Sequence, residues 1–175
     1  MNNDKMNNDI IIPQKYSRRV FLGAPFLLFL GWTAHNKKFP LIKYITPPLL
    51  LCSLIHWNKL KSTGIIRKID WLFAIAMMVA ITSYEKRFRK SDVFLWRCSM
   101  LIQLLTVIIN ASLFDIQTNP CSLLHVFFPM YKYTFPNTKE REYAYKRCVN
   151  THMFFIHILP GLITVRAMLR SKNLK

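Results

Sequence analysis

The sequence predicts an all-α protein, a polytopic transmembrane helical bundle with five or six spans, and three observations support this. The 175 residues are 52% hydrophobic and 14% aromatic, with a mean hydropathy of +0.17. Charged residues cluster in short groups separated by long apolar runs, whereas a soluble amphipathic helix has polar residues every few positions. The basic groups stand at the ends of these runs, as cations do at lipid headgroups.

The first three expected spans cover residues 20–35, 40–57 and 69–84. Arg18 and Arg19 precede the first one, as in a signal peptide, but further apolar runs follow, so we expect an uncleaved helix. The second contains the pair Pro47-Pro48, which predicts a kink that neighbouring helices can tolerate in a membrane. The third begins near Asp70.

The remaining expected spans cover residues 92–114, 121–135 and 150–168. Arg97 interrupts the fourth span near its start, and we expect it to snorkel to the interface or to pair with Asp92. The fifth segment carries His125 and a proline, so it could be re-entrant or interfacial instead of spanning. The number of spans therefore remains five or six.

The spans form one domain, residues 17–170, between a polar N-terminal tail of residues 1–16 and a basic C-terminal tail of residues 171–175. We expect the N-terminal tail to be disordered. Several spans are shorter than the ~20 residues that a typical bilayer requires, which suits a thin membrane. We therefore expect an integral membrane protein of the endoplasmic reticulum or another internal membrane. Both faces are basic, so the positive-inside rule does not set the orientation.

Charge and cysteine usage bear on the expected partners. The 25 Lys and Arg exceed the 8 Asp and Glu, for a formal net charge of +17. These cations flank apolar runs and lack the soluble scaffold that a nucleic-acid groove needs, so we expect membrane lipids as partners and no nucleic acid. The sequence does not indicate a protein partner. The cysteines have no CxxC spacing, so we expect neither a disulfide framework nor a structural zinc finger.

Polar groups at membrane depth are costly, so each one is a functional candidate. The candidates are Ser53, His56, Asp70, Arg97, Gln103, Asn110, Asp115, His125, His152, His157 and Arg166. The sequence contains no Gly-rich phosphate loop, GxSxG elbow or HExxH motif. Any chemistry must therefore come from side chains that different spans bring together.

Five of these candidates form an ordered set. Ser53 and His56 are three residues apart, so they share a face of the second span. Asp70 opens the third span, and His152 and His157 begin the last one. If these helices pack together, three imidazoles with an open fourth position would make a catalytic zinc site, and the carboxylate could orient or deprotonate the bound water. The implied reaction is hydrolysis of an amide or ester in a lipid substrate.

This ordered set resembles the CREST superfamily, whose members include alkaline ceramidases and adiponectin-receptor-like and hemolysin-like membrane proteins. The matching stretches are Ser53-Leu-Ile-His56, then Arg67-Lys68-Ile69-Asp70-Trp71 after a basic linker, then the two histidines of the last span. The resemblance implies a seven-helix bundle in which His56, His152 and His157 bind zinc. It also implies that Asp70 and Ser53 support the water and the oxyanion.

The sequence departs from the family pattern in three ways. Two residues separate Ser53 from His56 where the family has three, four separate His152 from His157 where the family has three, and there is room for at most six spans. Residues five apart lie ~140° apart around an α-helix. The two last-span imidazoles can therefore face one metal only if the helix is distorted. Pro160 removes a backbone hydrogen bond one turn further on, which would permit a π-bulge.

Each candidate also has a purely structural explanation. Asp70 could be the N-cap of its helix, His56 and His152 could be interfacial residues, and Ser53 could bond to its own backbone. His125 is an alternative third metal ligand. The alternative function is a non-enzymatic membrane protein, either an accessory or assembly subunit or a small transporter, whose candidate residues point to different faces.

Overall fold

The computed structural model describes residues 13–58, 65–118 and 138–171, and these residues are helical apart from short turns. The helices are α1 (Gln14–Ser17), η1 (Arg18–Gly23), α2 (Ala24–Asn36), α3 (Pro40–Asn58), α4 (Ile65–Ser83), η2 (Glu85–Arg87), α5 (Lys90–Thr118), α7 (Thr138–His152), η4 (Met153–Ile158) and α8 (Leu159–Leu169). Segments η1 and η2 are 3-10 helices, and η4 is a π-helix. The predicted all-α class is confirmed.

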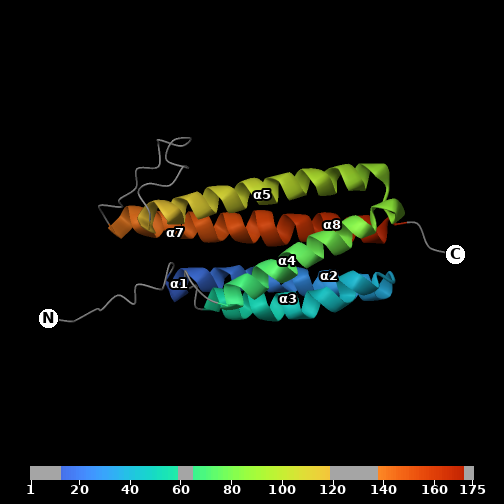
Figure 1. The fold of residues 1–175 in the computed structure, drawn as a ribbon, viewed down its shortest axis with the longest axis horizontal. Helices are drawn as coiled ribbons and strands as arrows, with labels where there is room; N and C mark the ends of the chain where they lie inside the picture. The colour runs from blue at the N-terminus through green and yellow to red at the C-terminus, as the bar shows by residue number, and fades with distance from the viewer. Residues whose placement is uncertain (1–12, 59–64, 119–137, 172–175) are drawn as a thin grey trace.

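Two groups of consecutive helices form continuous rods. Helices α1, η1 and α2 follow one another without a break, and so do α7, η4 and α8, so the described chain makes an elongated bundle with α3, α4 and α5 (Figure 1). Helices occupy the predicted segments 20–35, 40–57, 69–84, 92–114 and 150–168. The predicted segment 121–135 lies outside the described residues.

The rods differ from the predicted boundaries at their starts. The first rod begins at Gln14, inside the segment predicted to be a disordered tail, and Tyr16 is buried there against Tyr145. Residues 1–12 and 172–175 of the two predicted tails lie outside the described residues. Helix α3 continues as one α-helix through Pro47 and Pro48.

The rod α7–η4–α8 occupies the centre of the described bundle. Its α8 packs against both α2 and α5, and its η4 packs against η1 and α5. Helix α3 packs against α2 on one side and α4 on the other, and α4 crosses obliquely from α3 towards the start of α5 (Figure 1). The apolar core between the rods includes Leu30, Ala34, Ile42, Leu49, Met77, Trp96 and Met168. This arrangement leaves α5 at an edge of the bundle.

One tight turn and one arginine fix the end of the bundle near α2 and α3. Lys38 has a φ of 58°, and the amides of Lys38 and Phe39 bond back to the last carbonyls of α2, which is a Schellman helix end. Arg87 donates to the Lys37 and Lys38 carbonyls at 3.2 and 3.0 Å, and its guanidinium lies 3.9 Å from the centre of the Phe39 ring. The α2–α3 turn is thereby joined to the connection between α4 and α5.

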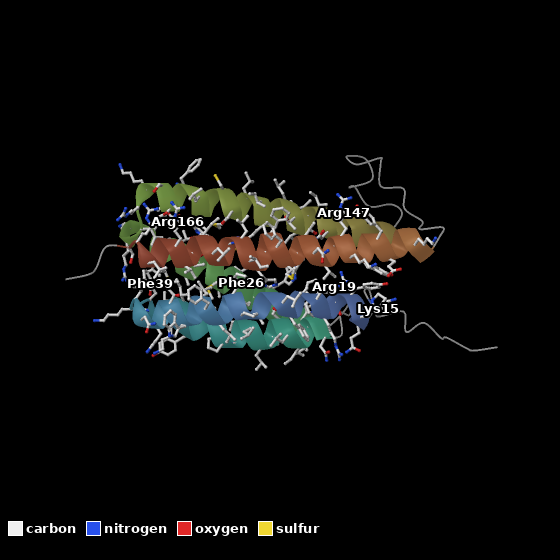
Figure 2. All side chains as sticks on the ribbon, turned by 180° about the vertical axis from the view of Figure 1, so that it is seen from behind. Lys15, Arg19, Phe26, Phe39, Arg147 and Arg166 are labelled. Atoms are coloured by element: carbon white, nitrogen blue, oxygen red, sulfur yellow. The ribbon has the colours of Figure 1, made fainter. Side chains whose placement is uncertain are left out.

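Two of the described helices are long and apolar enough to cross a membrane, over Lys90–Asn110 and Tyr145–Leu169. Only 28% and 33% of their apolar windows are buried, whereas a core helix of a soluble protein is mostly buried. Cationic side chains lie towards the two ends of the bundle. Figure 2 shows Lys15, Arg19 and Arg147 towards one end and Arg166 at the other.

Candidate functional site

His152 and His157 bracket the π-helix η4, which spans Met153–Ile158. A π-helix has a wider turn with i→i+5 hydrogen bonds, so it brings onto one face two residues that an α-helix would separate by about 140°. The centres of the two imidazole rings lie 5.1 Å apart. Pro160, early in α8, has no N–H to donate to the preceding turn. The distortion that the spacing of the two histidines requires is therefore present.

Helix α3 places two aromatic residues beside this pair, and both are buried. The Trp57 ring centre lies 4.3 Å from that of His152 and 5.6 Å from that of His56. His56 is close enough to His152 for charges on the two imidazoles to interact. The three predicted histidines therefore gather at the contact between α3 and the central rod.

Ser53 lies one turn before Trp57 on α3 and faces the same place. Ser53 and His157 line a cavity of about 10 Å³ with apolar side chains of η1, α2 and α3, which is near the smallest volume that admits a water molecule. Gly23 also lines this cavity, and a Cβ added there would stand 3.2 Å from the Cβ of His157. The His157 Nε2 atom is buried and has no hydrogen-bond partner within the described part of the chain.

Asp70 takes a different position from the one the sequence suggested. Helix α4 begins at Ile65, so Asp70 stands in its second turn and the N-cap explanation is wrong. Its carboxyl group is close enough to the thiol of Cys52 for the two groups to interact electrostatically. Cys52 is the residue before Ser53, so Asp70 lies at about the level of Ser53 along α3. Among the described residues, no group of three or more His, Cys, Asp or Glu is close enough to hold a metal ion.

The distance between the imidazole rings of His152 and His157 is one that two ligands of a single ion would have. Zinc–nitrogen bonds of about 2.0 Å at a tetrahedral angle place two ring centres about 5 Å apart, close to the observed 5.1 Å. The buried Nε2 of His157 also lacks a partner among the described residues, and a metal ion is one kind of partner that a ring nitrogen can take. His125, the alternative third ligand, lies outside the described residues.

A second polar group, at the opposite end of the central rod, was not predicted. The fully buried Asp92 accepts hydrogen bonds from Arg166 Nε at 3.1 Å and Arg170 Nη1 at 3.2 Å. Arg97 instead pairs with Glu85 at 2.7 Å. The predicted pairing of Arg97 with Asp92 is wrong, because residues five apart on a regular α-helix face different sides.

Helix α5 also has an unpredicted polar face. Its buried side chains between positions 90 and 110 are Asp92, Trp96, Ser99, Gln103, Thr106 and Asn110. The exposed ones include Phe94, Leu101, Ile102, Leu104, Leu105, Ile108 and Ile109. The sequence analysis treated Gln103 and Asn110 as isolated residues, although polar residues at helical spacing within an apolar run could have revealed the face.

Comparisons of the chain with protein-family models, curated proteins and solved structures find no match.

Proposed function

We propose that this protein is a multi-pass membrane protein that binds zinc at His152, His157 and His56 and hydrolyses an amide or ester bond of a lipid. The observation that carries the proposal is the π-helix η4, which turns two histidines five residues apart towards each other. A π-helix is rare in proteins, and where one occurs it is often at a functional site.

In the proposed membrane arrangement, both rods and the helices α3, α4 and α5 cross the bilayer. Helices α3 and α4 have 19 residues each, or about 28 Å at 1.5 Å per residue, close to the ~30 Å hydrocarbon core of a bilayer. Large apolar side chains are exposed on both rods and on α3, α4 and α5. Cations lie towards both ends of the bundle (Figure 2). A thin internal membrane such as that of the endoplasmic reticulum suits these lengths.

In the proposed site, His152 and His157 hold the metal and a side-chain rotation of His56 supplies the third nitrogen. Bound zinc would polarise a substrate carbonyl and lower the pKa of its water. The Ser53 hydroxyl, which lines the same cavity as His157, would donate a hydrogen bond to the carbonyl oxygen. Asp70 lies on the next helix at this depth, and we assign it a supporting role outside the ligand set.

The zinc content of the purified protein in lipid nanodiscs tests this proposal. We expect one zinc per chain in the unaltered protein and loss of it in His152→Ala and His157→Ala. The matched control is His35→Ala, an exposed histidine near the end of α2, which should keep its zinc. Ser53→Ala should also keep zinc while losing hydrolysis of lipid amides and esters. An unaltered protein that takes up no zinc when supplied with it would refute the proposal.

A second candidate is a non-enzymatic membrane protein, an accessory or assembly subunit or a small transporter. One observation favours it: the described side chains contain no ready-made cluster of three metal ligands. On this alternative the histidines and Trp57 only pack the helices together. Their replacement would then lower stability without changing zinc content or any lipid hydrolysis.

A further inference from the structure

Three arginines gather where the rod α7–η4–α8 ends beside the start of α5. Arg166 donates through Nε to Asp92 Oδ1 at 3.1 Å, and Arg170 donates through Nη1 to the same oxygen at 3.2 Å. Arg89 donates through Nε to the main-chain carbonyl of Arg170 at 3.3 Å. We call these three arginines the arginine triad. Their hydrogen bonds hold three guanidinium groups in one place.

The arginine triad carries more positive charge than the side chains around it neutralise. Its carboxylate partner within the described part of the chain is Asp92. The nearby Glu85 pairs with a different arginine, Arg97, at 2.7 Å. Three positive charges against one negative charge leave a charge of +2 at the triad.

This positive charge is accessible from outside the bundle, whereas the carboxylate is not. The side chains of Arg166 and Arg170 are 52% and 36% exposed, and that of Asp92 is fully buried. Arg89 is also exposed. The two Nη atoms of Arg166 and of Arg89 have no hydrogen-bond partner among the described residues. A ligand that approaches the triad therefore meets free guanidinium N–H groups and not the carboxylate.

A phosphate group is the ligand that these nitrogens fit. A guanidinium presents its N–H groups in a planar fork that matches the oxygens of a phosphate. A phosphate monoester carries about −1.5 to −2 charges at pH 7, close to the charge that the triad leaves unneutralised. A carboxylate or a phosphodiester carries a single negative charge, so it would balance the triad less completely.

The surroundings of the triad indicate that the phosphate belongs to a lipid. Arg166 lies at the same end of the bundle as Phe39 and far from Arg147 (Figure 2), which is the level of lipid headgroups in the proposed membrane arrangement. Leu162 precedes Arg166 by four residues on α8 and is 46% exposed, so it lies one turn deeper on the same face. A lipid held at Arg166 would place its acyl chains beside this apolar surface.

We propose that the arginine triad binds a lipid through a phosphate monoester in its headgroup. The three guanidinium groups donate to the phosphate oxygens, and the acyl chains lie along the outer face of α8 past Leu162. This inference rests on the membrane arrangement of the proposed function but not on its zinc site. Arg166 and His157 are nine residues apart, about 13 Å along the central rod, so the two sites can be tested separately.

Binding of phosphatidic acid to the full chain in detergent, counted by native mass spectrometry, tests the proposal. The comparison lipid is phosphatidylglycerol with the same acyl chains, whose phosphate is a diester. We expect the unaltered protein to bind one phosphatidic acid with an affinity about tenfold higher than for phosphatidylglycerol. Equal affinity for the two lipids would overturn the proposal.

Two variants should lose this preference. Arg89→Gln removes one exposed guanidinium and leaves the pairs with Asp92 in place. The triple variant Arg166→Gln, Arg170→Gln, Asp92→Asn removes the other two and leaves no buried carboxylate without a partner. A preference that persists in both variants would overturn the proposal.

The controls separate the triad from surface charge in general. Lys86→Gln and Arg19→Gln each remove an exposed cation outside the triad, and both should keep the preference. Its loss in these controls as well would show binding by overall charge and overturn the assignment to the triad. Excess inorganic phosphate should not displace phosphatidic acid, because it has no acyl chains. Displacement would show a site for free phosphate and overturn the assignment to a lipid.

The outcome is distinguishable from that of the zinc experiment. His157→Ala should lose its zinc and still prefer phosphatidic acid. An unaltered protein that holds zinc but shows no preference between the two lipids refutes this inference alone.

Discussion

Gly23 stands where the first rod comes closest to the π-helix. A side chain there would meet the Cβ of His157 at 3.2 Å and the Cγ of Met153 at 3.8 Å. Both neighbours belong to η4, whose backbone sets the direction of the imidazole. A methyl group at this position would therefore have to displace His157 by a few tenths of an ångström.

Gly23→Ala should lower both the unfolding free energy and the zinc occupancy. Forcing a methyl group into a packed contact typically costs about 1–3 kcal/mol, and relief would move His157. The matched control is Gly161→Ala, where an added Cβ meets nothing within 4 Å. That replacement should raise stability by up to about 1 kcal/mol, because alanine favours a helix interior more than glycine does. Denaturation in detergent with zinc analysis separates the two, and equal behaviour of both variants would contradict the role of Gly23.

Asp92 forms a buried ion cluster with Arg166 and Arg170. Removing the two arginines alone should be more destabilising than removing the arginines and the carboxylate together. Replacing Arg166 and Arg170 by Gln leaves a fully buried carboxylate without a cation, which should cost about 3–5 kcal/mol of unfolding free energy. Adding Asp92→Asn to that variant should restore most of the loss, because the remaining group is neutral. The control, Glu85→Gln, removes the more exposed pair with Arg97 and should cost less than about 1 kcal/mol. Chemical unfolding curves measure all three, and a triple variant no more stable than the double one would refute this account.

Sequence alone could not supply this cluster. The arginines that bind Asp92 are 74 and 78 positions away, so no local pattern links them. The nearest apparent partner, Arg97, lies on another side of the same helix and binds Glu85 instead. The histidines were more predictable, because an ionisable group in an apolar run is unusual wherever it occurs.

Apolar helices could be predicted from the sequence more easily than polar ones. The predicted segments 20–35, 40–57, 69–84 and 92–114 coincide with helices because hydropathy alone marks them. The last helix starts at Thr138, twelve residues before its predicted segment, because its first turns are polar. Those turns are supported by the pair Glu142–Lys146, whose charged atoms lie 3.1 Å apart, a local interaction that apolar periodicity does not report.

The sequence could predict the π-helix only as a requirement for His152 and His157 to face each other. The spacing of His152 and His157 shows that they need a distortion in order to meet, and Pro160 supplies a local cause. Whether the extra residue is accommodated there depends on η1, α3 and α5, which pack around the segment. Those contacts come from distant parts of the chain, so the sequence cannot fix them.

Deleting Phe154, an exposed residue within η4, should turn the π-helix into an α-helix. A π-bulge holds one residue more than an α-helix of the same register, so the flanking helices should keep their positions. The two histidines would become four apart and remain on one face. We therefore expect unchanged or higher thermal stability and retained zinc. This expectation fails if the shortened protein unfolds or loses its metal.

The control for this deletion is removal of Leu162, which is also exposed but lies in the regular helix α8. No bulge can absorb that change. Arg166 would rotate by about 100° away from Asp92, and the buried carboxylate would lose its partners. We expect this variant to be strongly destabilised by the same thermal measurement, in contrast to the deletion within η4.

For the whole molecule, α5 reverses the pattern of a soluble helix. It buries the polar face that runs from Asp92 to Asn110 and exposes leucine, isoleucine and phenylalanine. In water this arrangement would lose hydrophobic stabilisation on both faces, whereas in lipid the exposed apolar face costs nothing and polar groups gather between helices. The sequence predicted a membrane from the amount of apolar surface. The arrangement of that surface gives an independent argument for the same environment.

Leu101→Lys tests this argument, because its outcome differs between lipid and water. Leu101 is 58% exposed near the middle of the apolar part of α5. In a bilayer a lysine there should disfavour insertion by about 2.5–3.5 kcal/mol, whereas an exposed leucine-to-lysine change on a soluble bundle stays within about 0.5 kcal/mol. The control is Leu169→Lys, 50% exposed at the end of α8 beside Arg170, where the ammonium can reach the headgroups. Thermal denaturation of each variant in lipid nanodiscs should show Leu101→Lys clearly less stable than the unaltered protein and Leu169→Lys nearly unchanged. Equal stability of both variants would mean that α5 does not face lipid.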